Sequence, residues 1–177
     1  MVLLALLVVL LALGGAGWVW WRGSIGTLPL RPHCTATALG RSTQLSPEQA
    51  GNAAIIAAVA VHRNLPGRAA TIGIATAIQE SKLVNLSGGD RDSLGLFQQR
   101  PSQGWGTQAQ VQDPVYAAGR FFDHLVQTPG WDAGRLTDVA QAVQRSGFPE
   151  AYQQWEPMAT ELAAALVAGH LGALGCT

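Results

Sequence analysis

One glutamate stands out as a candidate acid, because it ends a helical segment that carries no other charge. Residues 69–79 read Ala-Ala-Thr-Ile-Gly-Ile-Ala-Thr-Ala-Ile-Gln, which is uncharged on every face and typical of a central, buried helix. Glu80 follows in the last turn, where the helix C-terminus and apolar neighbours both disfavour a negative charge. Both effects raise the pKa of a carboxyl and keep it protonated near neutral pH, as a general acid requires. The alternative is an exposed glutamate paired with Lys82 or Arg91.

The segment after this helix, about residues 84–112, is rich in Gly, Ser, Asp and Gln and predicts an ordered, functional loop. Gln98 and Gln99 can donate and accept hydrogen bonds at the same time, which suits sugar hydroxyls and N-acetyl groups. Trp105 and Tyr116 offer flat apolar faces on which sugar rings could lie. The alternative is that the aromatic rings pack in the core and the amides are ordinary surface groups.

These two segments together resemble the lysozyme-like superfamily, and within it the soluble lytic transglycosylases, the goose-type lysozymes and small actinobacterial envelope proteins. The resemblance covers about residues 45–168. It rests on Ala75-Thr-Ala-Ile-Gln-Glu-Ser81, followed by Gly95-Leu-Phe-Gln98 where the family has Gly-Leu-Met-Gln. The fold that the resemblance implies is mainly α, of the α+β lysozyme-like kind. It would be a helical bundle around a central buried helix, with a long cleft loop.

The resemblance also implies roles for single residues. Glu80 would protonate the glycosidic oxygen. Ser81 would help to orient Glu80 or contact the substrate, and Gln98 would bind an N-acetylhexosamine. In goose-type enzymes an Asp shortly before the Gly-Leu-Met-Gln motif positions a water molecule. Asp90 or Asp92 could occupy that place.

The chain departs from the family pattern at two points. The goose-type Asp two residues after the motif Gln is Arg100 here. The transglycosylase motif Ala-Tyr-Asn-Ala-Gly has its nearest match at Ala142-Val-Gln-Arg-Ser146, which lacks the tyrosine and has Gln144 in place of Asn. Tyr152 or Tyr116 would have to supply the missing phenol.

Hydrolysis of a glycoside usually needs two carboxylates, whereas by resemblance a lytic transglycosylase needs one. We therefore expect a muramidase that cleaves the MurNAc–GlcNAc bond of peptidoglycan strands, with the transglycosylase outcome preferred and Glu80 as general acid and base. The alternative is a non-catalytic glycan-binding or scaffold module of the cell envelope.

The N-terminus and the two cysteines predict a location outside the cytoplasm. Residues 1–21 contain no charged side chain, and about 20 apolar residues can span a bilayer as a helix. A membrane anchor is expected, with a cleaved signal peptide as the alternative. Cys34 and Cys176 bracket the rest of the chain, so we expect a disulfide, which persists only in an oxidising compartment. Two unrelated thiols are the alternative.

The chain therefore divides into residues 1–22 as anchor or signal, 23–44 as linker with a first strand, and 45–177 as the lysozyme-like domain. Helix start and stop signals predict five helices: from Ser46-Pro to about Arg63, from Pro66 through Ser81, from Asp113-Pro114 to about Gln127, from Thr137 to about Ser146, and from Pro149 with a break at Pro157 near Trp155.

Composition narrows the remaining classes of function. The 11 Lys+Arg balance 11 Asp+Glu, so no basic surplus favours nucleic acid. The four histidines are scattered and form no i, i+4 pair, so neither a metal site nor a cofactor is expected. The expected partners are peptidoglycan and, through the N-terminal helix, a membrane.

Overall fold

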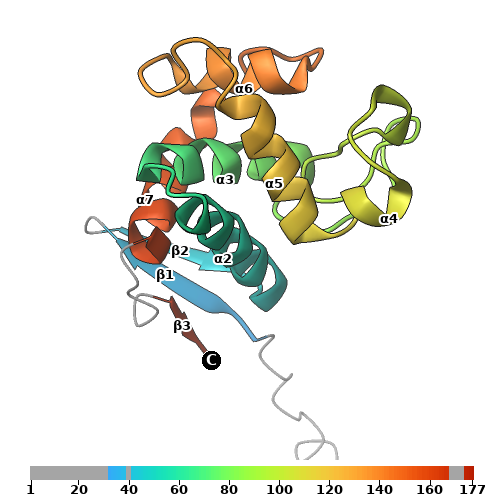
Figure 1. Cartoon of the computed structure of the whole chain (residues 1–177). Helices are drawn as coiled ribbons and strands as arrows, with labels where there is room; N and C mark the ends of the chain where they lie inside the picture. The colour runs from blue at the N-terminus through green and yellow to red at the C-terminus, as the bar shows by residue number, and fades with distance from the viewer. Residues whose placement is uncertain (1–31, 39–40, 168–173) are drawn as a thin grey trace, which may run out of the picture. The chain divides into compact units, whose positions relative to one another are not determined.

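The computed structural model describes residues 32–38, 41–167 and 174–177. These residues belong to one unit, Pro32–Thr177, in which helices predominate over a three-stranded antiparallel sheet (Figure 1). The expected mainly helical, α+β class is therefore confirmed. The expected anchor or signal at residues 1–22 lies outside the described residues. No helix within the described ranges is long and apolar enough to cross a membrane.

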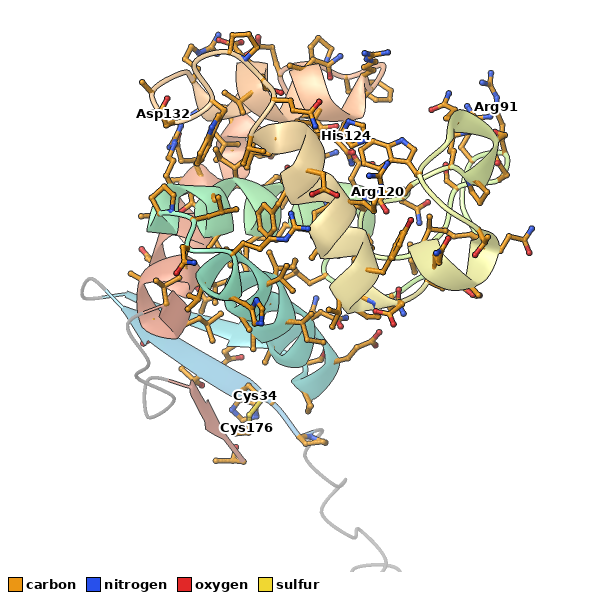
Figure 2. All side chains as sticks on the ribbon, viewed as in Figure 1. Cys34, Arg91, Arg120, His124, Asp132 and Cys176 are labelled. Atoms are coloured by element: carbon orange, nitrogen blue, oxygen red, sulfur yellow. A yellow bond between two sulfur atoms is a disulfide. The ribbon has the colours of Figure 1, made fainter. Side chains whose placement is uncertain are left out.

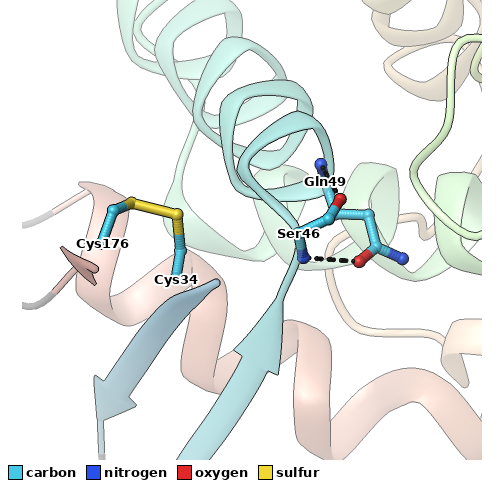
Figure 3. Close-up of a disulfide and its surroundings, with 4 residues drawn as sticks. All are labelled: Cys34, Ser46, Gln49 and Cys176. Carbon is cyan, nitrogen blue, oxygen red and sulfur yellow. Dashed lines mark hydrogen bonds between the residues drawn. A yellow bond between two sulfur atoms is a disulfide. The ribbon is translucent and has the colours of Figure 1, made fainter. Parts of the chain in front are cut away.

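The sheet is built from β1 (Cys34–Ala38), β2 (Arg41–Leu45) and β3 (Leu174–Cys176), in the order β2-β1-β3. Cys34 pairs with Leu45 on one side of β1 and with Cys176 on the other. A disulfide joins Cys34 to Cys176 across this strand pair, which confirms the expected bond (Figure 3). Within the span expected to be a linker with a first strand, residues 34–38 and 41–44 thus belong to the sheet.

The first two helices begin and end where their sequence signals predict. Ser46 caps α2 (Pro47–His62), and its capping box with Gln49 has both reciprocal bonds, from the Ser46 N–H to Gln49 Oε1 at 2.8 Å and from the Gln49 N–H to Ser46 Oγ at 3.2 Å (Figure 3). Helix α3 (Gly67–Ser81) is buried along most of its length, as its uncharged sequence predicts. Gly73 lets α2 approach closely, because a Cβ there would lie 2.9 Å from Ile56 Cγ2.

The middle of the chain contains one helix that the sequence signals predict and one that they miss. Asp113 caps α5 (Pro114–Leu125), accepting from the N–H groups of Val115 and Tyr116. The 84–112 segment is not wholly a loop, because α4 (Gln108–Val111) and a 3₁₀ turn at Pro101–Gln103 lie within it. A second capping box, Thr107 with Gln110, begins α4.

The C-terminal helices follow the predicted order with shifted boundaries. Helix α6 (Leu136–Gln144) begins before Thr137, so the expected cap there is wrong: Thr137 Oγ1 donates to the carbonyl of Pro149 instead. Residues 149–152 form a turn rather than a helix. A 3₁₀ turn (Gln153–Trp155) leads into α7 (Glu156–Val167), and Pro157 lies in the first turn of α7, so it marks the start of a helix rather than the expected break within one.

Helix α3 is the centre of the core, because α2, α5, α6 and α7 all pack against it. Figure 1 shows α2 and α7 between α3 and the sheet, with α6 and the α4 loop on the side away from the sheet. The two apolar residues of the Gly95–Gln98 motif, Leu96 and Phe97, are fully buried in this core. The motif therefore fixes the polar loop to the helix that ends in Glu80.

Candidate active site

A polar groove of about 460 Å³ lies at the C-terminal end of α3, and Glu80 is part of its wall. One side is formed by residues of the loop between Asp90 and Trp105. The other side is formed by Gln144–Phe148, the last residue of α6 and the turn that follows it. The groove thus joins the helix end and the loop that sequence reasoning placed together.

The Glu80 carboxyl is partly buried and accepts a hydrogen bond of 2.6 Å from the Tyr152 hydroxyl at Oε1. Burial raises the pKa of Glu80 above its ordinary value of 4.5. Hydrogen bonds from Tyr152 and Gln144, and the charge of Lys82, lower this pKa, but burial has the larger effect. A carboxyl in this state holds its proton at a higher pH than an exposed glutamate does.

Of the two tyrosines considered from the sequence, Tyr152 is the one whose hydroxyl contacts Glu80. The Tyr152 side chain is fully buried, and burial, followed by the charge of Glu80, raises the pKa of its hydroxyl. The phenol therefore stays protonated and remains a hydrogen-bond donor. Neither tyrosine lines the groove: Tyr152 lies behind Glu80, in contact with its carboxyl, whereas the Tyr116 hydroxyl lies 3.4 Å from the Trp105 carbonyl oxygen and its side chain lines a hollow between α2 and α5.

At the end of α3, Lys82 contacts the ring of Trp155, which in turn bonds to Gln79. The Lys82 ammonium lies 4.5 Å from the centre of the Trp155 ring, and the indole N–H donates to Gln79 Oε1 at 2.8 Å. No ion pair joins Glu80 to Lys82 or Arg91 in the part of the chain that the structure describes. The exposed, ion-paired alternative for Glu80 is therefore not what the structure shows.

Ser81 and Gln99 hold the loop in place from inside. The Ser81 hydroxyl contacts the carbonyls of Ala77 at 3.0 Å and Leu96 at 2.8 Å, and its side chain is buried. Gln99 is only 1% exposed, and its amide donates to the Ala117 carbonyl at 3.0 Å. Both side chains are thus used within the protein, although Gln99 contributes to the groove wall.

Gln98, Gln144 and Trp105 all line the groove. The Gln98 amide donates to the Gly95 carbonyl at 3.1 Å, while the Gln144 amide donates to the Phe97 carbonyl at 2.9 Å and ties α6 to the loop. Trp105 is half-buried, and its ring centre lies 4.4 Å from that of His124. Gln98 and Trp105 present polar and aromatic surface of the kind that carbohydrates require.

The two candidate water-positioning aspartates lie in different surroundings. Asp92 accepts from Arg100 Nε at 2.8 Å and from the N–H and hydroxyl of Ser102 at 2.8 and 3.0 Å. These bonds, the Ser102 N–H first, hold the pKa of Asp92 well below its usual range, and Asp92 does not line the groove. Asp90 does line the groove, with a 90% exposed side chain 3.9 Å from Arg91, which lies at the tip of the loop (Figure 2).

Phe148 is a groove residue that sequence reasoning missed. Its side chain is 76% exposed, unlike the three other phenylalanines, which are fully buried. An aromatic ring left in water at the wall of a polar groove offers a stacking surface. The turn sequence Ser146-Gly-Phe-Pro149, which keeps the ring out of a helix, was the available signal.

Several residues with left-handed backbone conformations line the groove or lie next to Glu80. Six described residues other than glycine have positive φ, and three of them, Arg91, Gln98 and Arg145, line the groove. Two more, Lys82 and Leu83, follow Glu80 closely. Each left-handed residue costs on the order of 1 kcal/mol and persists only where its surroundings impose it, which is common at functional sites.

No protein-family model matches the chain, and no curated protein is similar to it in sequence. Within residues 32–38, 41–167 and 174–177, no group of three or more His, Cys, Asp or Glu side chains could hold a metal ion.

The pH dependence of the wild type gives the first test of this geometry. Because burial raises the pKa of Glu80, activity that needs its proton should persist above pH 4.5 and be lost as the pH rises through the raised pKa. Replacing Tyr152 with phenylalanine removes a bond that lowers this pKa, so the basic limb should move to higher pH. We also expect kcat to fall by about tenfold, since the carboxylate left after proton transfer loses a donor. Profiles of kcat/KM for both proteins measure this, and a limb that moves to lower pH would contradict the assignment.

Proposed function

We propose that this protein is a peptidoglycan-cleaving muramidase of the lysozyme-like superfamily, acting as a lytic transglycosylase on the MurNAc–GlcNAc bond. The observation that carries the proposal is a single partly buried glutamate with a raised pKa, bonded to a buried phenol, in a groove of polar and aromatic side chains. The proposal also draws on the resemblance of the Glu80-Ser81 and Gly95–Gln98 motifs to that superfamily.

In the first step, Glu80 gives its proton to the glycosidic oxygen as the bond from that oxygen to C1 of MurNAc breaks. The carbonyl oxygen of the substrate's own N-acetyl group bonds to C1 and takes up the developing positive charge. Tyr152 donates a hydrogen bond to the Glu80 carboxylate that results. This donor stabilises the charged form of Glu80 after the proton has left, as the later role of Glu80 as a base requires.

In the second step, the Glu80 carboxylate takes the proton of the C6 hydroxyl, and the C6 oxygen displaces the N-acetyl oxygen at C1. The product is a 1,6-anhydro MurNAc end, no water is consumed, and Glu80 is protonated again. Neither aspartate is needed for this route. Asp92 is engaged by Arg100 and Ser102, and Asp90 is largely in solvent, so the arrangement suits one acid better than the pair that hydrolysis uses.

The location that we propose is the cell envelope, outside the cytoplasmic membrane. The disulfide between Cys34 and Cys176 supports it, because such bonds persist in oxidising compartments. An N-terminal anchor in residues 1–22 would hold the groove near the peptidoglycan, and a cleaved segment would leave the protein secreted.

The test of the transglycosylase outcome is the mass of the released muropeptides, with the Asp90→Asn variant measured alongside. We expect anhydro ends from the wild type, and release by Asp90→Asn within about twofold of it, since a largely solvated carboxylate contributes little to the single-acid route. Products heavier by one water than the anhydro form, lost on replacing Asp90, would show hydrolysis instead. Arg91→Gln, which removes the neighbouring charge of opposite sign, is the matched control.

The alternative function is a glycan-binding or scaffold module without catalysis, favoured by the loss of the goose-type second acid at Arg100. A suspension of purified peptidoglycan separates the two functions. An enzyme clears the suspension and releases soluble fragments, whereas a binding module sediments with the glycan and releases none.

A further inference from the structure

The Glu80 groove shares part of its wall with a second hollow. This second hollow has a volume of about 660 Å³ and is bounded by His124, Gln127 and Pro129. Four residues line both hollows: Gln103, Trp105, Gln144 and Arg145. No acidic side chain lines the second hollow.

Arg145 lines both hollows, and no described carboxylate forms an ion pair with its guanidinium. Asp138 and Glu156 are paired with Arg135 and Arg68. Within the described ranges, no side chain makes a hydrogen bond or ion pair with the Arg145 guanidinium. By contrast, the other groove arginines have carboxylates nearby: Arg100 lies 2.8 Å from Asp92, and Arg91 lies 3.9 Å from Asp90.

The backbone holds Arg145 in this place at a cost. It is the residue after α6 and has a left-handed φ of 53°, with its N–H bonded to the Gln141 carbonyl at 2.8 Å. Glycine fits such a position without strain and is the usual choice there. The chain thus carries a long cation where glycine would be favoured, at a position that lines both the Glu80 groove and the second hollow.

We propose that Arg145 binds a carboxylate carried by the 3-substituent of muramic acid, so that the groove favours glycans with this acid near the bond to be cleaved. This inference rests on the proposed function, and it names the substrate feature that the same site selects. A guanidinium presents a planar fork of donors that matches a carboxylate. In peptidoglycan the carboxylate is either that of the lactyl ether itself or, where a peptide stem is attached, one belonging to the stem. Chitin-type glycans carry neither.

The test measures binding by the full chain with Glu80→Gln, which prevents turnover. Three probes are titrated calorimetrically: N-acetylglucosamine tetramer, the stem-free GlcNAc–MurNAc tetrasaccharide, and the same tetrasaccharide with peptide stems. Adding Arg145→Gln should lower the affinity for one or both carboxylate-bearing probes by about fivefold to twentyfold. The affinity for the uncharged tetramer should not change. A lower affinity for the stem-free probe alone identifies the lactyl carboxylate as the group that Arg145 binds. A lower affinity for the stem-bearing probe alone identifies a carboxylate of the stem.

The matched control is Arg135→Gln, which removes the same charge at the other end of α6, outside both hollows. It should leave the affinity for all three probes unchanged, and Arg145→Lys should restore part of the lost affinity. If Arg145→Gln lowers the affinity for all three probes equally, or for none, the role of Arg145 in binding a carboxylate is overturned while the proposed function stands. Failure of the parent to bind any probe would instead reject the proposed function, and this inference with it.

Discussion

Replacing Glu80 with glutamine is expected to lower the rate of glycan release by a factor on the order of 10³ to 10⁴. Glutamine keeps the shape of the side chain and still accepts from the Tyr152 hydroxyl, but it has no acidic proton to give to the leaving oxygen. The measurement is the rate of soluble muropeptide release from purified peptidoglycan, with Asp90→Asn as the matched loss of a carboxylate in the same groove. Release at the wild-type rate by Glu80→Gln would rule out Glu80 as the acid.

The same variant should fold, and its stability tests the cause of the raised pKa. Because the folded-state pKa of Glu80 lies above its ordinary value of 4.5, the folded protein binds more protons than the unfolded chain between these two values. The free energy of unfolding therefore falls as the pH rises through that window. Glutamine does not titrate, so Glu80→Gln should be at least as stable as the wild type at pH 7, with a smaller pH dependence. Guanidinium unfolding at pH 4 and pH 7 measures this, and a variant much less stable at pH 7 would show that the carboxylate supports the fold.

Replacing both Cys34 and Cys176 with alanine is expected to cause the largest loss of stability. The two cysteines are 142 residues apart, and closing so long a loop removes about 5 kcal/mol of chain entropy from the unfolded state in the simplest model. The bond also secures β3, which has only three residues and lies at the edge of the sheet. Figure 2 shows the disulfide at the sheet, away from the Arg91 loop, so glycan release below the unfolding temperature should be retained.

Denaturant unfolding of the double variant, and of the wild type with and without reductant, measures the contribution of the bond. Reduction should lower the midpoint of the wild type and leave that of the double variant unchanged. Equal midpoints for the oxidised wild type and the double variant would contradict a stabilising role for the disulfide.

The features that could be predicted from sequence are those encoded by neighbouring residues. The capping box of Ser46 and Gln49 marks the start of α2, and the uncharged run before Glu80 predicts the buried α3. The disulfide could be predicted because the chain has only two cysteines, one at each end of the domain. Each of these predictions needs local information or simple counting.

The features that the sequence left open or predicted wrongly depend on contacts between distant residues. Tyr152 lies 72 positions from Glu80, and only the packing of the turn after α6 against α3 brings its hydroxyl to the carboxyl. Asp92 could have faced the groove, but Arg100 and Ser102 engage it at the base of a turn that composition did not reveal. Thr137 has the residue type of a helix cap, yet Arg135 occupies the cap position of α6, two residues earlier, and the Thr137 hydroxyl bonds to the Pro149 carbonyl.

The proposed activity depends on one carboxyl that keeps its proton in the groove at the end of α3. The most direct measurement is a titration of the Glu80 carboxyl carbon by NMR in protein labelled with ¹³C-glutamate, with Glu80→Gln to assign the signal. We predict a pKa above 4.5 that rises further in Tyr152→Phe. A Glu80 signal that titrates at or below 4.5 would contradict the account, because the groove would then hold a permanent anion rather than an acid.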